Sequence, residues 1–175
     1  MFKNLTALQS QNVLKENFLG TLSFANGEQP FVGTMTYFFD AGSLLILGYS
    51  KMGPSSLSLK GPTRVSFGVS KNSEFKNYNY ILLHGILSEL KADEGKKAIK
   101  CFNQGIQKII AKSESANLHF MIDLPQWIKT NKQQSIFRLQ LNTVKGKEYI
   151  AQTNISYLPH SNELETTSVT GFGDR

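Results

Sequence analysis

Hydrophobic and polar residues near the start of the chain follow first a helical and then an alternating spacing. The helical spacing predicts a short helix over Leu5–Glu16. The alternating residues form two runs, Phe18–Ala25 and Pro30–Phe39, which we predict to be strands. Asn26-Gly27 lies between them, and both residues tolerate the positive φ of a tight hairpin turn. The two strands are therefore expected to pair in antiparallel fashion.

More strands are predicted after a second turn at Asp40–Ser43. Leu44–Tyr49 is apolar on both faces, which is typical of a strand covered on both sides. Thr63–Ser70 alternates, and the longer strand Tyr78–Leu90 contains Gly85, which indicates a bend or bulge at a barrel corner. The last predicted strands are Ser135–Val144 and Lys147–Gln152, with a turn at Gly146 between them.

Helical spacing returns in two places. Met52–Lys60 is predicted to be a short helix that Gly61-Pro62 ends, and Asp93–Lys112 to be a long one. Residues 113–134 are expected to be irregular. The buried stripe of the long helix is predicted to be Ile99, Phe102, Ile106, Ile109 and Ile110.

Six or seven strands joined mainly by hairpins close more readily into a barrel than into a parallel sheet. We therefore predict a mainly β (α+β) fold, an antiparallel barrel with flanking helices. We assign one domain to residues 1–155 and expect the polar tail 156–175 to be poorly ordered.

Composition and charge narrow the function classes. The chain has 175 residues and a formal net charge of +6, which favours anionic partners. Its densest basic cluster, Lys96-Lys97 with Lys100, is typical of a solvated helix face, so we expect no nucleic-acid partner. One cysteine, no signal-peptide pattern and no long apolar run predict a cytoplasmic protein that does not enter a membrane.

Common catalytic and metal-binding motifs are missing from the sequence. His84, His119 and His160 lack metal-ligand spacing, so no metal site is expected. There is no Gly-x-Ser-x-Gly elbow, and no phosphate-binding glycine motif follows a strand. Cys101 is expected to serve helix packing, and His84 to be an ordinary, partly buried residue of a strand.

One segment, Tyr49–Ser56, does suggest a ligand. It follows a buried strand, precedes the predicted short helix, and combines hydroxyl groups with Lys51. Backbone N–H groups at a helix N-terminus favour an anion, and a phosphate would suit this chemistry.

The order of several short motifs resembles one known family. These motifs are Gly20-Thr21-Leu22-Ser23, Pro30–Tyr37, Arg64-Val65-Ser66-Phe67, Leu83–Leu87 and Phe137–Leu141 ahead of Lys145-Gly146-Lys147. In this order, over roughly Leu14–Glu148, they are similar to the pyridoxamine 5′-phosphate oxidase-like, FMN-binding split β-barrels. The resemblance implies a split barrel over residues 1–155 and a homodimer with FMN in clefts at the subunit interface.

The resemblance also implies the cofactor contacts. Thr34, Met35 and Thr36 would lie along the isoalloxazine edge or the phosphate. Tyr49, Ser50 and Lys51 would meet the ribityl phosphate, together with Ser55 and Ser56 from the following turn. Many family members carry a basic residue where this chain has Ser55-Ser56, and Lys51, Lys60 or Arg64 could replace it. The simpler alternative is that all these residues belong to strands and turns without a ligand.

The function that follows is that of an FMN-binding flavoprotein, an oxidoreductase acting on a small molecule. The residues identify no general acid or base, although His84 could donate a proton if it faced the flavin. The oxidase's own substrate-binding pattern is not visible near the C-terminus, so vitamin B6 oxidation itself is not expected. Two alternatives remain: a non-catalytic module that binds or stores flavin or haem on the same barrel, and a dimerising scaffold without a ligand.

Overall fold

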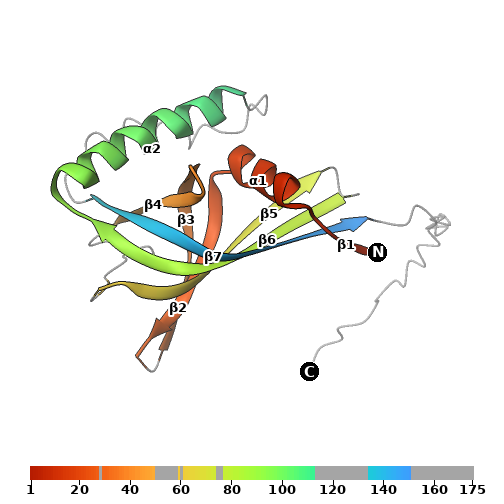
Figure 1. Ribbon diagram of the computed structural model, residues 1–175, viewed down its shortest axis with the longest axis horizontal. Helices are drawn as coiled ribbons and strands as arrows, with labels where there is room; N and C mark the ends of the chain where they lie inside the picture. The colour runs from red at the N-terminus through yellow and green to blue at the C-terminus, as the bar shows by residue number, and fades with distance from the viewer. Residues whose placement is uncertain (28, 50–58, 60, 74–76, 113–133, 151–175) are drawn as a thin grey trace, which may run out of the picture.

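The computed structural model describes residues 1–27, 29–49, 59, 61–73, 77–112 and 134–150 (Figure 1). The predicted short helix over Met52–Lys60, the irregular segment 113–134 and the tail 156–175 fall outside these residues, apart from Leu59 and Gln134.

The described residues form one antiparallel sheet and two helices. The strand order is β1-β7-β4-β3-β2-β5-β6, and a further pairing of β6 with β7 closes six of the seven strands into a ring. The predicted antiparallel barrel is therefore confirmed (Figure 1). The elements are β1 (Phe2–Asn4), α1 (Ala7–Glu16), β2 (Leu19–Asn26), β3 (Gln29–Asp40), β4 (Ser43–Tyr49), β5 (Thr63–Ser73), β6 (Asn77–Leu90), α2 (Ala92–Lys112) and β7 (Gln134–Ile150).

Strand β7 forms the seam of the ring. Near its start, Ile136 pairs with Leu47 of β4 on one side and with Leu90 of β6 on the other. Near its end, Tyr149 pairs with residues of β6 and of β1. The short β1, which the sequence pattern did not predict, therefore extends the sheet beyond the ring.

The predicted turn at Gly146 and the separate strand Lys147–Gln152 are wrong, because β7 runs without a break for 17 residues. Gly146 has a packing role instead. A Cβ atom there would overlap the hydroxyl of Ser10 and press on Leu5, so the missing side chain lets α1 approach the sheet. The glycine that resembled a turn therefore marks a close contact between distant parts of the chain.

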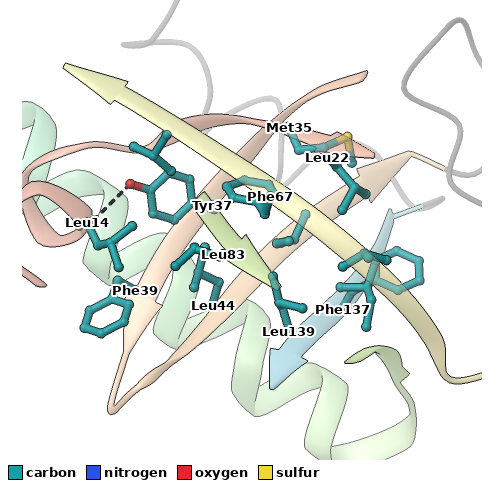
Figure 2. Close-up of a cluster of buried hydrophobic side chains, with 14 of the residues drawn as sticks. Leu14, Leu22, Met35, Tyr37, Phe39, Leu44, Phe67, Leu83, Phe137 and Leu139 are labelled. Carbon is teal, nitrogen blue, oxygen red and sulfur yellow. Dashed lines mark hydrogen bonds between the residues drawn. The ribbon is translucent and has the colours of Figure 1, made fainter. Parts of the chain in front are cut away.

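The interior of the barrel is filled by alternate residues of its strands, as the period-2 pattern predicted. Met35, Tyr37 and Phe39 of β3 point inward, and the rings of Tyr37 and Phe67 meet edge to face, with centroids 5.3 Å apart (Figure 2). The other fully buried strand residues of this cluster are Leu22, Leu44, Ile46, Val69, Ile81, Leu83, Leu87, Phe137 and Leu139.

Helix α1 packs onto this core. It begins at a capping box, in which Thr6 Oγ1 accepts from the Gln9 amide and the Gln9 side chain accepts from the Thr6 amide. Val13 and Leu14 are buried in the core cluster. The hydroxyl of Tyr37 donates a hydrogen bond of 3.1 Å to the carbonyl oxygen of Leu14 (Figure 2). The interior of the barrel is thereby linked directly to α1.

Strand β4 is buried on both faces, as predicted. Leu44 and Ile46 point into the barrel, whereas Leu45 and Leu47 point outward into a second cluster beneath α2. Of the predicted α2 stripe, Phe102 and Ile106 are buried, and Ile99, Ile109 and Ile110 only partly. Helix α2 thus covers the outside of the barrel over β4 and the start of β7 (Figure 1).

The predicted bulge at Gly85 is present. His84 pairs with Thr143 but Gly85 pairs with Leu141, so Asn142 is an extra residue on β7. A Cβ atom at residue 85 would overlap the carbonyl oxygen of Gln140, so the backbones approach more closely than any other residue would permit. Among the described helices, none is long and apolar enough to span a membrane.

Candidate functional site

The outward surface of β2, β5 and β6 carries a row of polar side chains. Cross-strand pairing places Ser23 beside Ser66, and Ser66 beside His84. All three residues have the outward parity of their strands, because neighbouring Val65, Phe67 and Leu83 point into the core. The row is half-buried, which leaves these groups accessible to a ligand.

Hydrogen bonds fix the row. The Oγ of Ser66 lies 2.9 Å from Nδ1 of His84, and the hydroxyl of Ser23 donates to the carbonyl of Ser66 at 3.4 Å. Because Nδ1 is engaged by Ser66, it is Nε2 that remains for other interactions. When the Ser66 hydroxyl donates this hydrogen bond to Nδ1, the neutral imidazole carries its own proton on Nε2 and can donate a hydrogen bond from there.

A pocket of about 450 Å³ lies on this row. Its polar side chains come from Arg64, His84 and the bulge residue Asn142, together with the two serines. Among the described residues that line it, none carries a carboxylate. The described lining of the pocket is thus rich in hydrogen-bond donors and carries the positive charge of Arg64.

The residues predicted on β3 occupy different environments. Thr34 is exposed on the outward face, and Thr36, also outward, is only 8% exposed. The side chain of Met35 lies in the barrel core at 2% exposure, so only its backbone could reach a ligand outside.

The end of β4 lies close to these threonines. Thr36 pairs with Leu47, and Tyr49 follows two residues further along β4, on the strand next to Thr34. Ser50, Lys51, Ser55 and Ser56 fall outside the described residues. Fold and register therefore bring Thr34, Thr36 and the backbone of Tyr49 together, where the predicted phosphate-binding segment begins.

Arg64 lies apart from this group. Thr34 pairs with Thr21, which pairs with Gly68, and Arg64 lies four residues from Gly68 along β5. Two strand spacings and four residues correspond to about 16 Å between backbone positions. Within one chain a single phosphate group does not span that distance. Arg64 therefore lies with Ser66 and His84 in this chain, and its predicted contact with the flavin stays a prediction.

Ser23, Ser66 and Asn142 were not predicted as site residues. The only signal for the serines was their outward position on strands whose inward residues are apolar. Asn142 becomes part of the pocket because of the bulge, and Gly85 was the only indication of that bulge.

A second, larger cavity of about 890 Å³ lies between α1, α2 and the end of β3. Its rim includes Lys15, Lys108 and the ion pair of Lys71 with Glu16. Cys101 also lines it and packs against the cluster beneath α2. Burial, followed by the negative charge of Asp40, raises the pKa of the Cys101 thiol, so the residue is poorly suited to be a nucleophile.

Comparisons with known proteins support the fold. No protein-family profile and no curated protein sequence matches this chain. Solved structures do match over most of it. A FAD-binding protein from Mesorhizobium loti is 21% identical, with a TM-score of 0.61, over 85% of this chain and 99% of its own.

Two further structures have related folds. A FAD and heme binding protein from Mycobacterium smegmatis is 12% identical, covers 83% of this chain and 72% of its own, and has a TM-score of 0.58. A candidate pyridoxamine 5′-phosphate oxidase from Corynebacterium glutamicum is 11% identical, with a TM-score of 0.54. The match covers 86% of this chain and 95% of the Corynebacterium glutamicum chain. The chain therefore has the split-barrel fold of the pyridoxamine 5′-phosphate oxidase-like proteins, which confirms the resemblance at the level of fold.

Proposed function

We propose that the protein is an FMN-binding flavoprotein that acts as an oxidoreductase on a small molecule. The observation that carries the proposal is the convergence of Thr34, Thr36 and the end of β4 on a split barrel whose structural neighbours are named as FAD-binding proteins. The hydroxyl and amide groups of these strands would hold the ring edge. Ser50, Lys51, Ser55 and Ser56 would hold the phosphate.

A bound flavin would supply the redox chemistry, and the chain would position it and exclude water. The backbone of Met35 would contact the ring, since the side chain lies in the core. We propose FMN because it is the cofactor that the family resemblance implies, while two structural neighbours are named as FAD-binding proteins. Titration with both nucleotides distinguishes them: tighter binding of FAD would contradict this choice.

We also propose that the protein is a homodimer, that the two copies meet through the outward surface of the barrel, and that the flavin lies at their interface. We propose that the dimer is found in the cytoplasm. The outward surface of the barrel exposes large apolar or aromatic side chains, which are typical of a protein interface. Phe2, Tyr78, Tyr80, Ile86 and Tyr149 lie on the adjacent strands β1, β6 and β7, and Val32 lies on β3. Light scattering after size-exclusion chromatography should give twice the chain mass; a monomer with full flavin affinity would contradict this part of the proposal.

The absorption spectrum of the purified protein tests the function. We expect flavin bands, and bleaching of those bands when NADH or NADPH is added anaerobically. Stable flavin bands without bleaching by any donor would favour a storage module. A Soret band would favour haem, which the Mycobacterium smegmatis neighbour is named as binding. A colourless protein that ignores added FMN would favour the scaffold without a ligand.

A further inference from the structure

We infer that Arg64, His84 and Asn142 form a second binding site, which takes the carboxylate or phosphate group of a small molecule and is separate from the phosphate site of the flavin. The inference rests on the pocket on the outward face and does not require that flavin binds. It assigns a role to the three polar groups that converge at the bulge between β6 and β7.

The chemistry of the pocket selects an oxyanion. Arg64 has a forked guanidinium that matches carboxylate and phosphate geometry, and the amide of Asn142 adds two N–H donors. His84 presents Nε2, because Ser66 engages Nδ1 at 2.9 Å. No ion pair between described residues involves Arg64.

Strand register and the bulge place the three residues around the pocket. Asn142 enters the pocket because the bulge inserts it as an extra residue, and Gly85 is what permits that bulge. Ser66 of β5 and His84 of β6 are cross-strand partners. Arg64 lies two residues before Ser66 on β5 and on the same face, so it lies near the imidazole of His84. The contact with Ser66 prepositions the imidazole of His84, which reduces the side-chain entropy that it loses when an anion binds.

Separation from the flavin follows from the register. The backbone of Arg64 lies about 16 Å from that of Thr34, because two strand spacings and four residues along β5 separate them. If a second copy covers the outward face, the pocket becomes more enclosed and its charge-assisted hydrogen bonds become stronger.

Histidine side-chain NMR on the full-length protein tests the site, with inorganic phosphate and acetate as separate probes. We expect saturable shifts of the His84 ring resonances, with His119 and His160 as internal references and His84→Gln for assignment. Phosphate binding alone would indicate a phosphate-bearing ligand, and acetate binding alone a carboxylate. His84 resonances that respond to neither probe would overturn the inference, and this outcome requires no variant to fold.

Two variants test the guanidinium. Arg64→Gln should weaken binding of the responding probe about tenfold or more, as expected for the loss of a charge-assisted pair. The matched control is Arg138→Gln, the same substitution at a site away from the pocket, where the arginine of β7 pairs with Glu94 of α2. This variant should change the affinity less than about twofold. Equal effects of the two variants would overturn the assignment of Arg64.

FMN and riboflavin distinguish this site from the flavin site. If FMN displaces phosphate from His84 and riboflavin does not, the pocket is the phosphate site of the flavin and the separation is wrong. If FMN binds without moving the His84 resonances while phosphate still does, both sites stand. If FMN does not bind and phosphate still does, only the proposed function fails.

Discussion

The hydroxyl of Tyr37 and the carbonyl of Leu14 are joined by a buried hydrogen bond that ties the interior of the barrel to α1. Tyr37→Phe should lower the free energy of unfolding by about 1–2 kcal/mol, because the carbonyl loses its partner in an apolar setting. Ser70→Ala, which removes an exposed hydroxyl from β5, should change it little. Urea unfolding measures both. Equal stability of wild type and Tyr37→Phe would show that this bond contributes nothing.

The same phenol predicts a dependence of stability on pH. Burial raises the pKa of the Tyr37 hydroxyl above its ordinary value. In the unfolded chain a tyrosine ionises near pH 10, whereas the folded protein keeps the proton on Tyr37. The contribution of the buried neutral phenol is therefore intact below about pH 10 and is lost as the pH rises further. The stability of wild type should fall more steeply there than that of Tyr37→Phe; parallel curves would argue against a buried phenol.

Gly85 should tolerate no side chain. Gly85→Ala places a methyl group against the carbonyl of Gln140, and relief requires the two strands to separate or the bulge to shift. We expect a loss of about 1–3 kcal/mol of stability, as for overpacked cores. Ser70→Ala, at an exposed position of β5, is the control. A Gly85→Ala protein with wild-type stability would mean that the strands are further apart than described.

Cys101 should react slowly with thiol reagents at neutral pH. Its pKa is raised by burial and by Asp40, so little thiolate is present. Asp40→Asn removes the negative charge and should increase the alkylation rate with iodoacetamide, while free cysteine provides the reference rate. Alkylation of wild type as fast as that of free cysteine would contradict this assignment.

Much of the fold could be predicted from residue patterns, because alternation and turn residues are local signals. The alternation and the Asn26-Gly27 turn predicted the antiparallel pair β2 and β3, and Gly85 predicted the bulge. The glycine at 146 was misinterpreted because its purpose is to admit Ser10, a residue far away in the sequence. A local pattern cannot distinguish a glycine that turns the chain from one that admits a neighbour.

The candidate site was less predictable for the same reason. The contact of Ser66 with His84 depends on the register between β5 and β6, which no single strand encodes. Asn142 joins them only because one residue is inserted opposite Gly85. The resemblance indicated the neighbourhood of Thr34 and Tyr49, but the distance from Thr34 to Arg64 became visible only once the strand order was known.

A fluorescence titration of FMN measures whether the segment after β4 binds the phosphate of the cofactor, as we propose. Ser50→Ala combined with Lys51→Ala should weaken binding by one to two orders of magnitude, about 1.5–3 kcal/mol for charge-assisted hydrogen bonds. Lys97→Ala, on the exposed surface of α2, should leave the affinity unchanged. FMN binding as tight in the double variant as in wild type would contradict the proposed phosphate site after β4.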